Sequence, residues 1–182
     1  MAILKEVFCS PLMVWEIGSG TGQHACHFAE HLPHLEWQAT DRPENIGGIR
    51  SWLEHAGLPN LKPPLTLDIN DEIWPCQSID AIFSANTLHI MSQREVETLF
   101  ERLAIYLADD ALACIYGPFN YGGNYTSDSN ARFDQWLKEQ NPLSCIKHFE
   151  DIVVLAQQIG LALQEDHTMP ANNRLLVFKR QI

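Results

Sequence analysis

The chain has 182 residues, of which 46% are hydrophobic and 19% charged; this composition is that of one globular domain and excludes a disordered chain. The net charge of −11 argues against binding to a nucleic-acid backbone, which requires clustered Lys and Arg, but it is compatible with a small cationic ligand. The sequence has neither a signal-peptide pattern nor an apolar stretch long enough to span a bilayer. Five scattered cysteines without a C-x-x-C pair favour reduced thiols and a cytoplasmic location.

Apolar runs alternate with helical patterns along the first two thirds of the chain. The apolar runs predict strands at 12–17, 35–41, 64–69, 78–86 and 111–117. The helical patterns lie between them, at 22–32, 45–57 and 94–107. Strand–helix–strand units of this kind require right-handed crossovers, so we expect a parallel sheet covered by helices on both faces.

The last third of the chain follows a different pattern. A helix is predicted at 149–160, and two strands follow closely at 161–170 and 172–180. A connection this short between strands requires an antiparallel hairpin, so we expect a mixed sheet. Residues 117–130 are rich in Gly and Asn and predict a long loop, which is either a substrate wall at the sheet edge or a mobile surface loop. The core is expected to contain Trp15, Trp37 and Trp52.

The segment VWEIGSGTGQHA (14–25) carries the main functional motif, E-x-G-x-G-x-G. A dinucleotide-binding loop reads G-x-G-x-x-G, and its last glycine would fall at position 23, where this chain has Gln23. The loop opens a helix N-terminus, whose free N–H groups suit a phosphate or a carboxylate. Glu16, directly before the glycines, disfavours a pyrophosphate and suits an ammonium or sulfonium group. The motif therefore favours S-adenosylmethionine, which has no phosphate, over a nicotinamide dinucleotide.

Acidic residues at predicted strand ends supply partners for the rest of this cofactor. Asp41 ends the second strand, where a carboxylate accepts hydrogen bonds from both ribose hydroxyls. Asp68 ends the third strand, where a carboxylate accepts from the adenine amino group while the N–H of Ile69 donates to the ring. The segment SANTLHI (84–90) follows the fourth strand at the edge that faces the sulfur. Ligands of open α/β sheets bind at this edge, beyond the carboxyl ends of the strands.

These segments resemble the class I methyltransferases that use S-adenosylmethionine and, more narrowly, domain-of-unknown-function family 938. The resemblance rests on EIGSGTGQHA, WQATD, LDI, SANTLHI, YGPF, SNARFD and MPANN and covers nearly the whole chain. It implies one domain over 1–182, with a Rossmann-like three-layer αβα fold and a seven-stranded, mostly parallel sheet whose last strand is antiparallel. The cofactor-binding residues it implies are Glu16, Gly18, Ser19, Gly20, Gly22, His24, Asp41, Asp68, Ile69 and Asn86.

The N-terminal lead-in departs from the family pattern. Relatives carry a longer segment before the first strand, which helps to cover the cofactor, whereas about eleven residues precede LMVWEI here. Two explanations stay open: the lead-in is truncated, or another part of the chain supplies the lid.

Other residues have two interpretations each. His89 and Tyr116 are candidate catalytic residues, and His89 is otherwise a structural residue beneath the pocket floor. The candidate substrate-binding residues, which are otherwise turn formers, are Asn120, Tyr121, Asn172 and Asn173. A zinc site on the helix face of His24, His27 and His31 lacks a fourth ligand, so we predict no metal.

The sequence thus predicts a cytoplasmic S-adenosylmethionine-dependent methyltransferase that acts on a small molecule. Asn86 is not followed by the prolines of amino-directed nucleic-acid methyltransferases, so neither a nucleic acid nor a membrane is an expected partner, while a homodimer stays open. The alternatives are a non-catalytic binding protein with this fold, acting through a partner, and a nicotinamide-dependent oxidoreductase.

Overall fold

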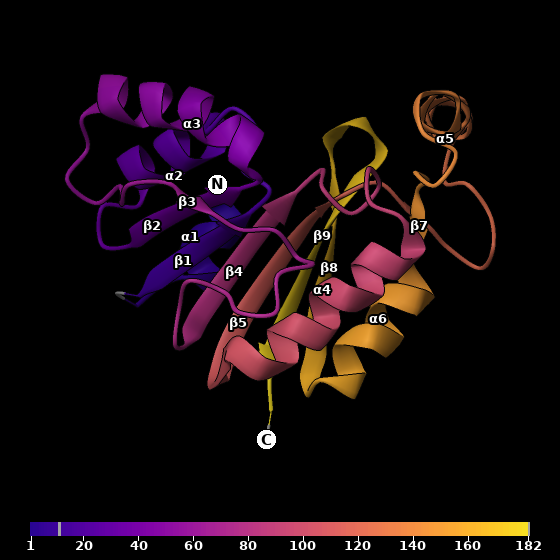
Figure 1. Cartoon of the computed structure of the whole chain (residues 1–182). Helices are drawn as coiled ribbons and strands as arrows, with labels where there is room; N and C mark the ends of the chain where they lie inside the picture. The colour runs from indigo at the N-terminus through magenta and orange to yellow at the C-terminus, as the bar shows by residue number, and fades with distance from the viewer. Residues whose placement is uncertain (11, 182) are drawn as a thin grey trace.

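A seven-stranded sheet with helices on both faces organises the chain, as the computed structural model shows for residues 1–10 and 12–181 (Figure 1). Along the sheet the strands follow the order β3-β2-β1-β4-β5-β9-β8. Their bounds are β1 Met13–Ile17, β2 Glu36–Asp41, β3 Leu65–Thr66, β4 Ile79–Ala85, β5 Leu107–Gly117, β8 Leu161–Met169 and β9 Asn173–Arg180. β9 is antiparallel to both of its neighbours, whereas the pairs among β1 to β5 are parallel. The predicted mixed sheet with a reversed last strand is confirmed.

Six helices and one short strand pair complete the described fold. The helices are α1 Ala2–Val7, α2 Gln23–His31, α3 Pro43–Ala56, α4 Gln93–Tyr106, α5 Asp128–Gln140 and α6 Phe149–Gln158. The short pair consists of β6 Phe119–Asn120 and β7 Lys147–His148, and a single 3-10 turn, Pro170–Asn172, joins β8 to β9. None of the helices in the described part of the chain is both long and apolar enough to cross a bilayer.

The core forms two layers, one on each face of the sheet. On one face Phe8 and Phe28, from the α1 and α2 segments, pack with Trp37 of β2. On the other face Leu103 of α4 and Ile152 of α6 join a second cluster. Because the inner strands are buried on both faces, their apolar runs are continuous rather than alternating, and this continuity made them recognisable in the sequence.

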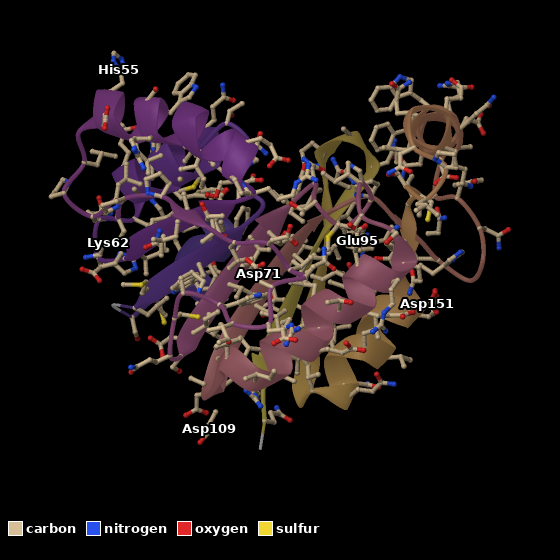
Figure 2. The ribbon with its side chains drawn as sticks, in the orientation of Figure 1. His55, Lys62, Asp71, Glu95, Asp109 and Asp151 are labelled. Atoms are coloured by element: carbon tan, nitrogen blue, oxygen red, sulfur yellow. The ribbon has the colours of Figure 1, made fainter. Side chains whose placement is uncertain are left out.

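The helix ends follow local rules that the sequence displays. Ser92 accepts a hydrogen bond from the Glu95 N–H, and the Glu95 carboxylate accepts from the Ser92 N–H, which forms a capping box at the start of α4. Glu95 is labelled in Figure 2 near the upper end of α4. α3 begins at Pro43 and ends before Gly57, which adopts a φ of 59°.

Four expectations need correction. β3 spans only two residues, because the chain turns away after Thr66. β5 begins at Leu107, directly after α4, four residues earlier than predicted. Residues 117–130 are not a continuous loop, since they contain β6 and the first turn of α5. Trp15 and Trp37 are buried as expected, but Trp52 lies on the outer side of α3 and is 45% exposed.

α5 stands apart from the two helix layers. Figure 1 shows it beside β7, near the turn between β8 and β9, at the edge of the sheet where β4 and β5 end. It contacts that turn through Asn130, whose Nδ2 donates to the Asn172 carbonyl at 3.2 Å. This placement brings a helix that was absent from our prediction to the edge where a ligand is expected.

Candidate functional site

The glycine loop follows β1 and is held against β2. The N–H groups of Gly18 and Ser19 both donate to the Thr40 carbonyl, at 3.1 and 3.0 Å. The Ser19 hydroxyl donates to the Glu16 carbonyl and accepts from the Thr40 N–H. These bonds fix the loop between the two strands and direct its next residues to the N-terminus of α2.

The three glycines of the loop have positive φ angles but different neighbours. A Cβ at Gly18 (φ 76°) would lie 2.6 Å from Thr87 Oγ1, and one at Gly22 would lie 3.2 Å from the side chain of Ile49. A Cβ at Gly20 (φ 58°) would have no atom within 4 Å. A side chain at Gly18 or Gly22 would therefore crowd other residues of the protein. Gly20 instead faces open space, which a ligand-binding loop requires.

Asp41 ends β2, as predicted, and its carboxylate organises the loop. Oδ2 accepts from the Gly20 N–H at 2.7 Å, while Oδ1 accepts from the Arg42 N–H and from Asn45 Nδ2, each at 2.8 Å. The side chain is largely buried, with 8% of the residue exposed. Each carboxylate oxygen has further acceptor capacity, so Asp41 can hold the loop and still accept from a ligand.

Glu16 is a buried acid beneath the loop. Its Oε2 accepts from Trp37 Nε1 at 3.0 Å, and its Oε1 lies 3.9 Å from Nδ1 of the half-exposed His24. Burial raises the pKa of Glu16 to about 7, against the opposing effect of the Trp37 hydrogen bond. Burial also lowers the pKa of His24, so the His24 contact is not a full ion pair. A cation near Glu16 would favour its ionised form.

Asp68 and Ile69 lie in the loop after β3. The prediction that Asp68 ends the third strand is wrong, because β3 ends at Thr66. The Asp68 carboxylate accepts from the N–H of Asn70 at 2.9 Å and from its Nδ2 at 3.0 Å, which forms a local turn. The chain still lies beside β2 at this point, since the Leu67 N–H donates to the Asp41 carbonyl.

A cleft of about 500 Å³ opens at the ends of β4 and β5. Residues from four segments line it: Asn86, His89, Pro118, Ser129, Asn130, Phe133, Ala171, Asn172 and Asn173. Asn86, His89, Asn172 and Asn173 were candidate site residues in the sequence, and the structure brings them together. Asn86 is also the residue directly after β4, with a φ of 57°. A volume of this size falls in the range of about 300–1,000 Å³ that small-molecule sites occupy.

His89 is the titratable side chain of this cleft. It is 93% buried, and neither ring nitrogen forms a hydrogen bond with any of the described residues. Burial lowers its pKa to about 4, and the positive charge of Lys147 acts in the same direction. The imidazole is therefore neutral at physiological pH, and its unprotonated nitrogen can accept a hydrogen bond.

The structure does not bring Asn120 and Tyr121 to this cleft. Asn120 is buried in β6, and Tyr121 donates from its hydroxyl to Asp166 at 2.9 Å while its ring stacks on Phe149. The other catalytic candidate, Tyr116, accepts at its hydroxyl from Asn173 Nδ2 at 3.0 Å. Tyr116 thus supports a lining residue rather than lining the cleft itself.

Five lining residues were not named individually as candidates: Pro118, Ser129, Asn130, Phe133 and Ala171. Pro118, Ser129 and Asn130 lie within 117–130, the segment expected to be either a substrate wall or a mobile surface loop. Three of them, Ser129, Asn130 and Phe133, belong to SNARFD, a segment that carries the family resemblance. Thr87, which touches Gly18, was also missed, although it lies in SANTLHI. In both cases the sequence marked the segment, and the fold was needed to show what each side chain contacts.

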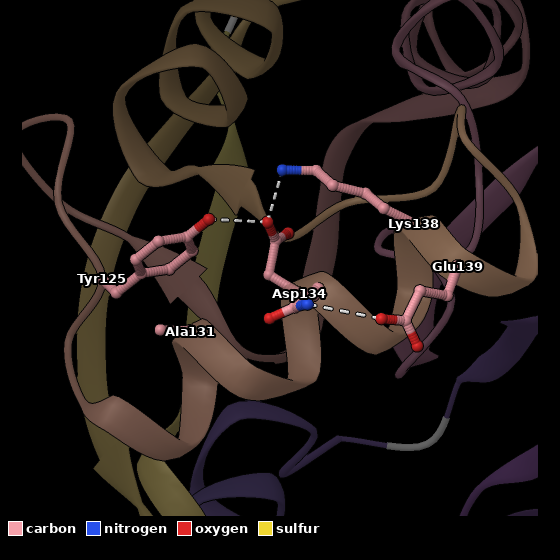
Figure 3. A pocket seen from close by; sticks show the side chains of 6 residues that line it. Tyr125, Ala131, Asp134, Lys138 and Glu139 are labelled. Carbon is pink, nitrogen blue, oxygen red and sulfur yellow. Dashed lines mark hydrogen bonds and ion pairs between the residues drawn. The ribbon is translucent and has the colours of Figure 1, made fainter.

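A second hollow lies on the outer side of α5 (Figure 3). Asp134 is at its centre, and its Oδ2 accepts from the Tyr125 hydroxyl at 2.7 Å and from Lys138 Nζ at 2.6 Å. Its Oδ1 accepts from the Ile146 N–H. The buried carboxylate is thus fully engaged, and it fastens α5 to the segment before β7.

His27 and His31 lie next to each other on α2. The rings of His27 and His31 lie 4.4 Å apart, and His31 Nδ1 is 2.8 Å from the His27 carbonyl. Among the residues that the structure describes, no three His, Cys, Asp or Glu side chains gather in a way that could hold a metal ion.

A family model and several solved structures match this chain. A family model described as "Protein of unknown function (DUF938)" matches residues 1–180. An O-methyltransferase family protein from Burkholderia thailandensis matches 99% of this chain with a TM-score of 0.87 and 17% identity. The mitomycin 7-O-methyltransferase MmcR matches 93% (TM-score 0.81, 18% identity), and the S-adenosylmethionine-dependent methyltransferase SibL matches 96% (TM-score 0.81, 20% identity). This chain covers 55%, 49% and 52% of those chains, about half their length. The likeness establishes a shared methyltransferase fold.

Proposed function

The chain belongs to the DUF938 family of proteins of unknown function, and from its glycine loop we propose that it is an S-adenosylmethionine-dependent methyltransferase acting on a small molecule. The proposal rests on the hydrogen bond from the Gly20 N–H to the Asp41 carboxylate. This bond connects a loop residue that faces open space to a buried acid. The SibL structure is that of a methyltransferase that uses this cofactor, which supports the same assignment.

The residues of the loop fit the parts of this cofactor. The space over Gly20 accommodates the methionine part beside the N-terminus of α2, where free N–H groups suit a carboxylate. Glu16 supplies negative charge beneath the cationic groups, and Asp41 accepts from the ribose hydroxyls. We assign the adenine to the loop of Asp68 and Ile69, in which the Asp68 carboxylate retains acceptor capacity beside its bonds to Asn70.

When bound, S-adenosylmethionine supplies an electrophilic methyl group on a sulfonium sulfur. The role of the protein is chiefly to position the acceptor, and such alignment contributes up to about 7–11 kcal/mol to lowering a barrier. We assign the cleft at the ends of β4 and β5 to the acceptor. His89 lines this acceptor cleft as a neutral imidazole and orients a hydroxyl acceptor by accepting a hydrogen bond from it.

A direct binding test separates this proposal from its alternatives. Thermal unfolding is measured with S-adenosylmethionine, S-adenosylhomocysteine and NAD in parallel, each over a concentration series. A ligand at about 100 times its Kd adds roughly 2.7 kcal/mol to the free energy of unfolding, so we expect a saturable rise in Tm with the first two. A rise with NAD alone would overturn the proposal.

Binding without turnover has a different meaning. A protein that binds S-adenosylmethionine and transfers no methyl group across a broad panel of small acceptors would be a binding protein with a methyltransferase fold. The matched control is the Asp41→Ala variant, which should lose the Tm rise with both ligands.

A further inference from the structure

The acceptor cleft carries no formal charge. At neutral pH its lining combines four asparagines, one serine, the neutral His89 and the apolar Pro118, Phe133 and Ala171. None of these described residues offers a carboxylate to an ammonium group or an ammonium or guanidinium to an acid. Because a buried, unpaired charge is costly, a lining without charged groups offers no direct partner to an anionic or a cationic ligand. The Lys147 ammonium, whose charge acts on His89, is 2% exposed and donates instead to the carbonyls of Met91 and Cys145.

The amide donors along one side of the cleft are already used. Asn130 Nδ2 donates to Thr126 Oγ1 and the Asn172 carbonyl, and Asn173 Nδ2 donates to Tyr116 and the Pro170 carbonyl. Asn172 Nδ2 donates to Ser129 Oγ.

These bonds set the orientation of two of the amides. Because backbone carbonyls only accept, they fix which end of the Asn130 and Asn173 amides is the nitrogen. The three Oδ1 atoms of Asn130, Asn172 and Asn173 take part in no bond among the described residues. This side of the cleft therefore offers acceptors, and it suits a ligand that brings hydrogen-bond donors.

Two aromatic rings also line the cleft. The rings of His89 and Phe133 lie 5.1 Å apart and meet at 80°, so they form a corner. Phe133 is backed by Trp136, which stacks on it at 5.9 Å and 14°. A flat aromatic ligand that stacks on one of these two rings meets the other ring edge to face, and both arrangements are ones that aromatic groups prefer.

The wall that carries the acceptors is rigidly placed. Ala171 and Asn172, at the tip of the β8–β9 hairpin, both adopt φ angles near 60°, which non-glycine residues rarely do. The bonds of Asn172 to α5, through Ser129 and Asn130, hold this turn in place. The cleft is thus shaped before any ligand arrives.

We propose that this cleft binds an uncharged, flat aromatic compound that bears a hydroxyl group, and that the hydroxyl is the methyl acceptor. This inference rests on the proposed methyltransferase activity. The hydroxyl donates a hydrogen bond to a ring nitrogen of His89. Its oxygen forms the new bond to the methyl carbon, and its proton is released to water. The methyl–sulfur bond breaks with its electron pair remaining on sulfur, so S-adenosylhomocysteine and the methyl ether are the products.

Three matched probes test the ligand class without requiring turnover. They are 2-naphthol, 2-methoxynaphthalene, which lacks the donor, and 2-naphthoate, which is anionic. Their Kd values are measured by fluorescence with and without S-adenosylhomocysteine. We expect 2-naphthol to bind at least tenfold more tightly than either of the others. Equal affinities, or tightest binding of 2-naphthoate, would overturn the inference.

Variants locate the binding in the cleft. Phe133→Ala should weaken 2-naphthol binding at least tenfold, and His89→Phe, which keeps a ring but removes the nitrogens, should reduce the preference for 2-naphthol over 2-methoxynaphthalene. Gln135→Ala, on the exposed side of the same helix, is the control and should change nothing. Unchanged 2-naphthol binding in Phe133→Ala, with the fold intact by circular dichroism, would also overturn the inference.

The cofactor measurement distinguishes the two proposals. A protein that binds S-adenosylhomocysteine and methylates a charged or aliphatic acceptor in preference to 2-naphthol disproves the ligand class and leaves the methyltransferase activity standing. A protein that binds 2-naphthol in the cleft but neither form of the cofactor disproves the methyltransferase activity.

Discussion

Thr87 lies directly against the Cα of Gly18, so close that a Cβ on that glycine would come within 2.6 Å of Thr87 Oγ1 and 2.7 Å of its Cγ2. Thr87 belongs to the segment after β4, and its hydroxyl also lies 3.3 Å from the Ile17 carbonyl, to which it donates. The contact therefore joins the glycine loop to the segment that leads on to His89 in the acceptor cleft.

Gly18→Ala and Gly20→Ala should differ in what they damage. Both add a side chain at a positive φ, which costs about 1–2 kcal/mol, but only Gly18→Ala adds a collision, worth about a further 1–3 kcal/mol. We expect urea unfolding to show a loss of about 2–5 kcal/mol for Gly18→Ala and about 1–2 kcal/mol for Gly20→Ala. Gly20→Ala should nevertheless lose cofactor affinity, because its new methyl group occupies the ligand space.

Thr87→Ala tests the cause of the Gly18→Ala defect. In a double-mutant cycle, it should restore at least 1 kcal/mol of the loss in Gly18→Ala, since it removes the two closest atoms. Strict additivity of the two changes would show that the collision does not determine the defect.

Asp41→Ala should impair both the loop and the cofactor site. Removing the carboxylate leaves the Gly20 N–H, the Arg42 N–H and Asn45 Nδ2 without their acceptor, which costs about 1–3 kcal/mol of unfolding free energy. Calorimetry should show at least a tenfold rise in the Kd for S-adenosylmethionine. Glu44→Ala, which removes an exposed acid from the start of α3, is the control. Equal cofactor affinity in Asp41→Ala would refute the ribose assignment.

Glu16 should make cofactor binding depend on pH. With its pKa raised to about 7 by burial, Glu16 is largely protonated at pH 6, and a cationic ligand must displace that proton. Affinity for S-adenosylmethionine should therefore rise with pH by up to about tenfold per unit below pH 7 and level off above it. Glu16→Gln should bind with the weak, low-pH affinity throughout. If the affinity of Glu16→Gln showed the same pH dependence, a titratable group other than Glu16 would be its cause.

The same raised pKa predicts how Glu16 affects stability. A group whose folded pKa lies above its unfolded value stabilises the fold fully below the unfolded pKa of 4.5 and loses that contribution as pH rises to about 7. The Glu16→Gln variant should therefore gain stability relative to the wild type between pH 5 and pH 7, as measured by urea unfolding at each pH. A constant difference over that range would show that Glu16 is not protonated in the fold.

Lys147 should add to the lowering of the His89 pKa, of which burial is the larger cause. This lysine is 2% exposed, and its Nζ donates to the carbonyls of Met91 and Cys145 rather than to a carboxylate. Lys147→Met removes the charge at similar length, so the His89 pKa should rise from about 4 toward its ordinary value of 6.5. An NMR titration of the His89 ring measures this directly, with the exposed Lys5→Met as control. If the His89 pKa is the same in Lys147→Met as in the wild type, burial alone lowers it.

The periodicity of the sequence predicted most of the sheet but not α5. Strands buried on both faces produce short apolar runs that are easy to identify, such as MVW (13–15) in β1 and AIF (81–83) in β4. The buried positions of α5 are Asn130, Asp134 and Leu137, two of them polar. A hydrophobic pattern cannot reveal a helix that is held by hydrogen bonds to the Tyr125 hydroxyl and the Ile146 N–H.

The cofactor half of the site was easier to predict than the acceptor half. The glycines and Asp41 lie at strand ends that chain order alone places together. The acceptor cleft instead depends on the contact of α5 with the hairpin tip, which joins Asn130 to a residue 42 positions away. The assignment of Asp68 to a strand end was wrong because β3 pairs with β2 over only two residues, Leu65 and Thr66. The sequence pattern does not specify where a strand this short ends.

The two halves of the site come from different parts of the chain, and β9, which inserts between β5 and β8, completes the second half. The glycine loop and its Asp41 contact use residues 16–41, and their supporting strands β1, β2 and β4 are complete by Ala85. The cleft cannot close until Ala171 and Asn172 have emerged and β9 has paired with β5. A chain that stops before residue 171 therefore contains every residue of the glycine loop and its Asp41 contact but lacks the hairpin tip that completes the acceptor cleft.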